Sequence, residues 1–337
     1  MCTVTRQVLD IVIVGAALLG VAAAGCDRAA PALSGQTRPA SGSEPPPDPP
    51  STWPDARVGE FWRRVSAGPS LKPARWPENA VVAVALSFDY QMGTVYEPSP
   101  AASTNTNSQY DGRVGLPRIL KVLDKHRVPA SFFVTGVTAQ FYPDTIKQIT
   151  ASGRHEIGVH GWIHENNTTL SAAEEKRLLA KAIAALTAAS GRKPVGYRSP
   201  SWAFSDATLA LLREFGFLYD SGMMADEEPY EVFIDGRATG LLEIPVEWMR
   251  DDAMYFQRQN PHSPAAVYET WRAEFDKAYE EGGLFQLTMH PRISGHRSRV
   301  VMLEQLITYM RGKRGVWFAT HEQVARFVHD SRESHSH

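Results

Sequence analysis

The sequence predicts one α/β domain, folded as a barrel of about seven strands. From Ala80 onward, short apolar runs rich in β-branched residues alternate with longer amphipathic segments. This alternation suits a barrel better than a flat sheet. In such barrels catalytic residues lie at the C-terminal ends of strands. Five expected strands end in a polar residue, namely Asp89, His160, Arg198, Asp220 and His290. The shared position favours a catalytic site over scattered polar residues.

The alternation gives each element in turn. Strands are expected at 81–88, 130–135, 155–160, 195–198, 218–220, 241–246, 284–290 and 316–319. The first is β-branched enough to be buried on both faces. Helices are expected at 114–126, near 143–152, at 171–190, 205–215, 265–280 and 300–311, and from His321. Val114, Ile119 and Leu123 stand at helical spacing, and Ser171 can cap its helix, with Glu174 three residues on.

The N-terminal segment 1–26 has the pattern of a signal peptide. Arg6 precedes an apolar run at 11–24 that is too short to cross a bilayer as a helix, which needs about 20 residues. The letters AAGC at 23–26 resemble a bacterial lipobox. We therefore expect Cys26 to be lipidated and to become the mature N-terminus, with a plain signal peptide cut nearby as the alternative.

The residues between this signal and the barrel form two expected segments. Segment 27–53 is rich in proline and cannot bury enough apolar surface to order itself, so it predicts a disordered tether. Segment 54–79 contains Phe61 and Trp76 and predicts a strap packed on the domain surface. At the other end of the chain, residues 328–337 are expected to be a disordered tail.

Cysteine content and charge exclude several classes of function. Cys2 and Cys26 are the only cysteines, and both lie in the targeting segment. The mature domain therefore has no disulfide, no thiol nucleophile and no cysteine-ligated zinc or iron–sulfur site. The formal net charge is −2, with both signs mixed along the chain, so no basic stripe indicates nucleic-acid binding.

His160 and His164 are the expected metal ligands. They stand four residues apart, directly after an apolar strand, where one helical turn or a tight turn would aim both imidazoles at the same point. Two unrelated surface histidines are the competing interpretation of this spacing.

Two other strand ends suggest acid–base chemistry. A carboxylate such as Asp89 is costly after an apolar strand unless it is paired or binds a metal. Its position therefore predicts that Asp89 is a general base, or else that it caps the following loop. His290, followed by the rigid Pro291, suits a general acid near neutral pH. A satisfied core histidine is the alternative.

The segment from Arg198 to Trp202 offers groups for positioning and binding. Arg198 supplies a fixed-charge fork that can hold a carboxylate. Pro200 stiffens the loop, and Trp202 offers a flat apolar wall for a sugar ring. We expect Trp202, Pro200 and Tyr90 to contact the substrate, the alternative being a surface arginine beside a core tryptophan.

Together these motifs resemble the polysaccharide deacetylases, also called carbohydrate esterase family four or the NodB-homology domain. The ordered motifs are Phe88-Asp89, His160-x-x-x-His164, Arg198-x-Pro200-x-Trp202 and a late strand ending in His290. The resemblance covers residues 80 to about 327. Segments 113–118, 196–202, 219–221 and 288–291 are similar to the branch that holds peptidoglycan deacetylase-type and cyclic imidase or allantoinase-type enzymes.

The resemblance implies a distorted (β/α) barrel, a divalent metal and a role for each strand-end residue. The metal, usually zinc, with cobalt or manganese as alternatives, would be held by His160 and His164. Asp89 would be the base, Arg198 would orient it, and His290 would protonate the leaving nitrogen. An acidic residue normally tunes that histidine; the candidates in order are Asp220, Asp252 and Asp226.

One position departs from the family pattern. The metal site usually includes a carboxylate one or two residues after the base, where this chain has Tyr90 and Gln91. The ligands would then be His160, His164 and Asp89, with Gln91 as a weak fourth. The alternatives are a working enzyme with a rearranged site, a metal-poor hydrolase like some allantoinase-type relatives, and an inactive descendant.

The expected function is N-deacetylation of an envelope polysaccharide such as peptidoglycan. A lipid anchor at Cys26 would hold the enzyme at a membrane of the cell envelope, facing the periplasm or the exterior. The alternatives are hydrolysis of a small cyclic imide or ureide, as in allantoinase, and a non-catalytic glycan-binding lipoprotein. The sequence does not indicate an oligomeric state.

Overall fold

The computed structural model describes residues 50–52, 54–92, 106, 109–257 and 260–335. Residues 1–49, including Cys26, lie outside this range, so the signal peptide, its lipidation and most of the tether remain predictions. The described residues contain no helix long and apolar enough to span a membrane. The chain from residue 53 onward forms one compact unit, which contains the sheet and the predicted catalytic, metal-binding and substrate-binding residues.

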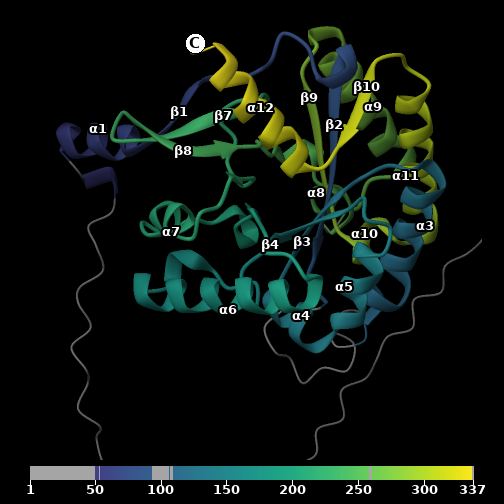
Figure 1. Cartoon of the computed structure of the whole chain (residues 1–337), viewed down its shortest axis with the longest axis horizontal. Coiled ribbons are helices and arrows are strands. Elements are labelled where there is room, and N and C mark those ends of the chain that lie inside the picture. Colours follow the sequence, from purple (N-terminus) through teal and green to yellow (C-terminus); the bar gives the residue numbers. More distant parts are fainter. Residues whose placement is uncertain (1–49, 53, 93–105, 107–108, 258–259, 336–337) are drawn as a thin grey trace, which may run out of the picture. The chain divides into compact units, whose positions relative to one another are not determined.

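A curled ten-stranded sheet forms the centre of this unit (Figure 1). Its order is β1-β7-β8-β6-β5-β4-β3-β2-β10, with β9 paired to the other edge of β2. Eight strands run parallel in the sheet: β2 (Val82–Tyr90), β3 (Ser131–Val134), β4 (Glu156–Val159), β5 (Gly196–Tyr197), β6 (Tyr219–Asp220), β8 (Arg237–Glu243), β9 (Leu284–Met289) and β10 (Val316–Ala319). The sequence predicted all eight, and the distorted α/β barrel is confirmed.

Two antiparallel strands extend the sheet beyond this prediction. β7 (Tyr230–Ile234) pairs with β8, and β1 (Val65–Ser70) pairs with β7 at the edge. Residues 54–79 are therefore not only a surface strap, because they form α1 (Asp55–Arg64) and an edge strand. The ring of the buried Trp76 packs 6.0 Å from that of Trp317.

Helices cover the sheet, and Figure 1 shows α3, α9 and α11 along one side and α4, α5 and α6 along another. Their bounds are α3 (Leu116–His126), α4 (Gly136–Phe141), α5 (Pro143–Thr150), α6 (Ala172–Ser190), α7 (Thr208–Glu214), α8 (Asp252–Phe256), α9 (Pro264–Glu281), α10 (Pro291–Ser294), α11 (Arg297–Arg311) and α12 (His321–His335). The Ser171 hydroxyl accepts a hydrogen bond from the Glu174 amide, as the predicted cap requires. The disordered tail expected from residue 328 is wrong, because α12 continues through this segment and buries Val328.

Strand β2 positions the candidate site. It pairs with β3, β9 and β10, and every one of its residues is buried. Since side chains alternate along a strand, Phe88 and Tyr90 pack into the larger apolar cluster. Ser87 and Asp89 therefore face the opposite side, and Gln91, just after the strand, lines the same cavity as Asp89.

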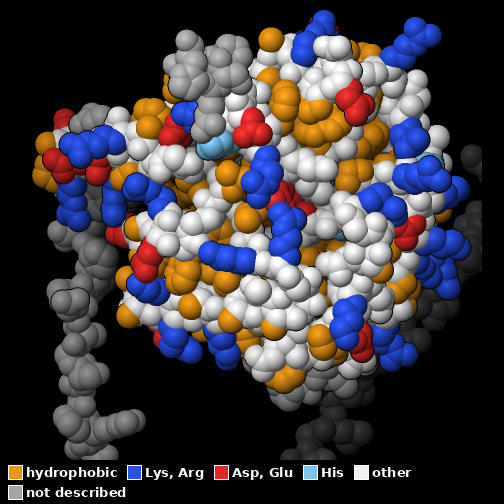
Figure 2. Space-filling view, viewed as in Figure 1, with side chains coloured by type: hydrophobic (Ala, Val, Ile, Leu, Met, Phe, Trp, Pro, Cys, Tyr) orange, Lys and Arg blue, Asp and Glu red, His pale blue; other side chains and the backbone are white. Residues whose placement is uncertain are grey.

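The surface carries no large patch of one charge on the face seen in Figure 2. Lysine and arginine side chains are spread among acidic and apolar ones over that face. The formal net charge of the whole chain is −2.

Candidate active site

Arg198 holds Asp89 in place at the C-terminal end of β2. One Arg198 amino group donates to Asp89 Oδ1 at 2.8 Å and to Ser87 Oγ at 2.9 Å. The other guanidinium nitrogens donate to the carbonyl and hydroxyl of Ser221. Burial raises the pKa of Asp89, but Arg198, His160 and His290 together lower it to about 2. Asp89 is therefore ionised, and its Oδ2 lies 3.7 Å from His160 Nε2 and 4.0 Å from His290 Nε2.

His160 and His164 lie on a tight turn rather than on a helical turn. β4 ends at Val159, and the φ angles of Gly161 (69°) and His164 (61°) are positive. The Glu165 carboxylate closes the turn by accepting hydrogen bonds from two backbone amides, those of residues 162 and 163. The two imidazole rings then meet edge to face, 5.1 Å apart. The expected convergence of both rings is present, although by a different backbone path.

Gln91 stands between His160 and an arginine that the sequence did not suggest. Its Nε2 lies 2.9 Å from His160 Nε2, and its Oε1 accepts a hydrogen bond of 3.0 Å from Arg292 Nη1. The position of the missing carboxylate ligand thus presents an amide N–H to the histidine. With this donor set, the residues around His160 and His164 do not fit a divalent ion as they stand.

The described residues contain one compact group of three ionisable side chains that could hold a metal, and it is a different group. It consists of Asp251, Asp252 and His290, whose ligand atoms lie within 4.8 Å of one another. Asp252 is already engaged: its Oδ1 is 2.7 Å from His290 Nδ1, and its Oδ2 accepts hydrogen bonds from the His290 amide and the Ser294 hydroxyl. This geometry is that of a carboxylate that orients an imidazole.

Asp252, not Asp220, is therefore the carboxylate that tunes His290, which corrects the first choice made from the sequence. Burial and Arg292 lower the pKa of His290, but Asp252 and Asp251 raise it above its usual value overall. His290 Nδ1 donates to Asp252, so its Nε2 can carry a second proton toward Asp89. The pair is arranged as a base and a charged acid facing the same space.

Asp220 and Asp226 serve other purposes. Asp220 on β6 is paired in register with Glu243 on β8, and both side chains are completely buried. Burial raises the pKa of both carboxyls, and Asp220 raises that of Glu243 further, so the pair retains a proton. The Asp226 carboxylate accepts hydrogen bonds from the backbone of its own loop.

A cavity of about 200 Å³ contains the acid and the base. Its lining residues are Asp89, Gln91, His160, His164, Ser201, Trp202, Trp248, Asp251, Ala253, Met254, Gln257, His290 and Arg292. Trp202 and Trp248 form its aromatic wall, with ring centroids 4.3 Å apart, and 48% of Trp248 is exposed. Trp202 therefore lines the cavity, where it can contact a substrate as expected.

The other two expected substrate contacts are wrong. Tyr90 is fully buried in the apolar core, because alternation along β2 turns it away from Asp89. Pro200 is also buried, and it packs so closely on Gly161 that a Cβ there would lie 2.8 Å from the proline ring. Pro200 therefore fixes the turn that carries His164. Trp248, Met254 and Gln257 were missed, since no local pattern brings their segment to the site.

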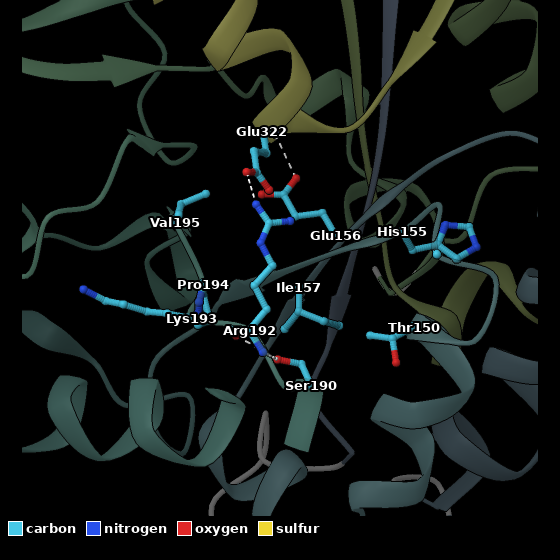
Figure 3. Close-up of a pocket in the computed structure, with 11 residues that line it drawn as sticks. Thr150, His155, Glu156, Ile157, Ser190, Arg192, Lys193, Pro194, Val195 and Glu322 are labelled. Atoms are coloured by element: carbon cyan, nitrogen blue, oxygen red, sulfur yellow. Dashed lines mark hydrogen bonds and ion pairs between the residues drawn. The ribbon is translucent and has the colours of Figure 1, made fainter. Parts of the chain in front are cut away.

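A second cavity, of about 210 Å³, lies at the opposite end of β4 (Figure 3). In Figure 3 the Arg192 side chain reaches toward Glu322, with which it forms an ion pair. The buried Glu156 accepts hydrogen bonds from the Ser131 and Tyr219 hydroxyls and from the Glu322 amide. These groups satisfy one another at the N-terminal ends of strands, which is the stabilising face of a barrel.

Comparisons with known proteins agree with this geometry. Residues 82–219 match the family model described as polysaccharide deacetylase. A peptidoglycan deacetylase of Helicobacter pylori is 32% identical over 247 residues, which cover 64% of this chain and 84% of the relative. The chain belongs to the polysaccharide deacetylase family. It is a hydrolase of carbon–nitrogen bonds other than peptide bonds.

Solved structures of this family share the fold. A putative polysaccharide deacetylase from Mycobacterium smegmatis has 35% identity and a TM-score of 0.72, over 79% of this chain and 96% of that one. A Puue allantoinase has 26% identity and a TM-score of 0.71, over 79% of this chain and 95% of that one. The polysaccharide deacetylase fold of this chain is thus shared with enzymes of two substrate classes.

Proposed function

We propose that this polysaccharide deacetylase removes acetyl groups from an N-acetylated envelope polysaccharide such as peptidoglycan. The observation that carries the proposal is the opposition of Asp89 Oδ2 and His290 Nε2, 4.0 Å apart in the cavity. A base for the attacking water and an acid for the leaving nitrogen, both lining one cavity, are what hydrolysis of an acetamide needs.

The reaction uses the positions of these two groups. Asp89, held by Arg198, takes a proton from a water that attacks the acetyl carbonyl carbon. His290, held by Asp252, gives its Nε2 proton to the departing sugar nitrogen as the carbon–nitrogen bond breaks. Proton transfer of this kind contributes about 10²–10⁴-fold to a rate. Once the products leave, Asp89 loses its proton and His290 regains one through water before the next cycle.

The aromatic wall supports a glycan substrate. Trp202 and Trp248 present flat apolar surface beside the catalytic pair, and such surface suits the apolar face of a pyranose ring. The Helicobacter pylori relative is a peptidoglycan deacetylase and matches most of its length to this chain. An envelope location, with lipidation at Cys26, would place the site next to this polymer.

The resemblance implies zinc, with cobalt or manganese as alternatives, and such an ion would act as a Lewis acid on the carbonyl. His160, His164 and Asp89 are the residues that would hold it, as the sequence predicted. Because Gln91 directs an N–H at His160, this donor set does not fit an ion, and the mechanism above uses none.

A second candidate function is hydrolysis of a cyclic imide or ureide. It is favoured by the structural likeness to an allantoinase, which covers 95% of that chain. Export to the envelope would count against it, since small imides and ureides are ordinarily handled in the cytoplasm. A glycan-binding lipoprotein without activity is the third candidate, and the intact Asp89–His290 pair counts against that one.

One assay separates the three. The full-length chain, purified in detergent, is incubated with N-acetylglucosamine oligomers, with peptidoglycan and with a cyclic imide. Release of acetate together with free amine supports the deacetylase. Opening of the imide without acetate release supports the second candidate. Binding of the oligomers without either reaction would leave only the glycan-binding protein.

A further inference from the structure

The contact between Gln91 and Arg292 has a fixed direction. Both side chains are buried, with relative exposures of 1% and 5%. A guanidinium has donors only, so the Gln91 group that faces Arg292 Nη1 at 3.0 Å must be the carbonyl oxygen. The amide nitrogen of Gln91 is therefore the atom that faces His160 Nε2 at 2.9 Å.

The same reasoning fixes the proton of His160. Its Nδ1 lies 2.9 Å from the carbonyl oxygen of Arg198, which can only accept, so Nδ1 carries the hydrogen. The Nε2 lone pair then accepts the hydrogen bond from Gln91. Three directional hydrogen bonds run from Arg292 through Gln91 and His160 to the Arg198 backbone. In this series of hydrogen bonds, each side chain has the one orientation in which every donor faces an acceptor.

This series of hydrogen bonds hinders the binding of a divalent cation at His160. A metal would need the Nε2 lone pair of His160, which Gln91 already uses. Rotation of the Gln91 amide to offer its oxygen would set an NH₂ group against the guanidinium of Arg292, donor against donor. In addition, the permanent positive charge of Arg292 lines the same cavity as His164 and His290. A cation between these residues would be repelled by that guanidinium.

Arg292 also has capacity to bind a ligand. It lines the cavity that holds Asp89 and His290. Its Nε is buried and forms no hydrogen bond with any of the residues that the structure describes. It belongs to α10, which begins directly after His290, so the two side chains are carried by one rigid turn. A guanidinium that lines the cavity beside the reacting groups is suited to an anion.

We propose that Arg292, oriented by Gln91, replaces the metal ion in this enzyme and stabilises the oxyanion formed during amide hydrolysis. The inference rests on the proposed function. Water oxygen bonds to the carbonyl carbon, its proton goes to Asp89, and the carbonyl electron pair moves to the oxygen, which faces the guanidinium. When that pair returns, the carbon–nitrogen bond breaks and the nitrogen takes the His290 proton. The products are a free amine and a carboxylic acid.

The first test measures metal in the purified full-length chain. After dialysis against a chelator, we expect less than one-tenth of an equivalent of zinc, cobalt, manganese or iron, and no change in cobalt absorption on titration. The Gln91→Glu variant sets a carboxylate oxygen against His160 Nε2, and we expect it to bind cobalt at least tenfold more tightly than the wild type. One equivalent of tightly bound metal in the wild type would overturn the inference.

The second test measures the binding of an anionic analogue of the tetrahedral intermediate. A glucosamine methylphosphonamidate carries the tetrahedral anionic group of the intermediate, whereas the N-acetylated oligomer is neutral. We expect Arg292→Met to weaken binding of the phosphonamidate more than tenfold while binding of the oligomer changes less than threefold. Arg292→Lys should restore part of the difference. Arg297→Met, at an exposed arginine on α11, is the matched control and should bind both ligands as the wild type does.

Equal phosphonamidate binding by the wild type and Arg292→Met, including no binding by either, would overturn the role of Arg292. Activity gives a separate readout: loss of one oxyanion donor typically lowers kcat about 10²–10³-fold, with little change in KM. If no acetate is released although the phosphonamidate binds through Arg292, the proposed deacetylation fails and the anion site stands.

Discussion

The Nδ1 atom of His290 lies 2.7 Å from Oδ1 of Asp252, which places the acid of the site at the end of a fixed hydrogen bond. The backbone amide of His290 donates to the other oxygen of the same carboxylate. Two contacts from one residue to one carboxylate fix both the ring orientation and its tautomer. The proposed mechanism depends on this contact and on the one between Arg198 and Asp89.

Asp252→Asn should lower the pH at which the enzyme loses activity on the alkaline side. His290 acts while protonated, and Asp252 raises its pKa against the effects of burial and Arg292. Without that carboxylate the pKa of His290 falls, so the alkaline limb of kcat/KM should move to lower pH. The measurement is the pH profile from 5 to 9, with Asp226→Asn as the control. Coincident profiles for wild type and Asp252→Asn would exclude this role.

Asp89→Asn should reduce both activity and stability. Loss of the base should lower kcat about 10²–10⁴-fold. Asparagine can still accept from Arg198, but the buried guanidinium loses its charged partner, which costs about 1.5–3 kcal/mol. Because the native pKa of Asp89 is lowered to about 2, this stability is present above the unfolded value near 3.8 and is lost as pH falls toward 2. Denaturant unfolding at pH 7 and pH 3 measures it; an equal deficit at both pH values would contradict this origin of the stability.

Trp248→Ala should weaken glycan binding without altering the chemical step. Trp248 is 48% exposed beside Trp202, so its loss removes stacking surface but opens little core. Since aromatic contacts of this kind contribute about 0.5–1.5 kcal/mol, KM for an N-acetylglucosamine hexamer should rise about 2–10-fold with kcat nearly constant. Phe141→Ala, which changes a 64% exposed ring away from the cavity lining, is the control. An unchanged KM would remove Trp248 from the substrate site.

Asp220→Asn should stabilise the fold increasingly as pH rises. Burial raises the pKa of Asp220 above its usual value, so the folded state holds a proton that the unfolded state has lost. Wild-type stability therefore falls between those two pKa values, by at most about 1.4 kcal/mol per pH unit. Asparagine has no such proton, so the substitution removes this pH dependence. The measurement is thermal unfolding at pH 4.5 and pH 7.5. The stability of Asp220→Asn relative to the wild type should be greater at pH 7.5 than at pH 4.5. Asp235→Asn, in the exposed β7–β8 turn, is the control and should show no such difference.

Much of the fold can be predicted from local patterns in the sequence. The eight parallel strands and the helices between them match the apolar periodicity, since burial on both faces of β2 requires a continuous apolar run. β1 was missed because Gly68 and Pro69 argue against a strand, and such residues are tolerated only at a sheet edge. β7 had a signal that was overlooked: Asp235-Gly236, both with positive φ, is a hairpin turn.

The site was predictable only where its residues end strands. Asp89, His160, Arg198 and His290 converge because the C-terminal ends of parallel strands meet at one end of the barrel. Asp252 begins the short helix α8 in a long connection, and no periodicity reveals which strand end that connection reaches. For the same reason Asp220, at a true strand end, was the more attractive partner for His290 although it faces Glu243.

Arg292 shows a further limit of sequence patterns. It stands two residues after His290, close enough to have been considered, but its partner Gln91 lies far away in the sequence, just after β2. Only the structure shows that the residue in place of the missing carboxylate is held by a cation. The departure at Gln91 was visible in the sequence, and its physical consequence was not.

The most direct test of the proposed mechanism is the release of acetate from N-acetylglucosamine oligomers by the full-length chain. We predict acetate and free amine in equal amounts from the wild type, without added metal and in the presence of a chelator. Asp89→Asn and His290→Gln should lower the rate at least about 100-fold. No acetate from the wild type with or without zinc, cobalt or manganese, or equal rates for all three proteins, would contradict the central claim.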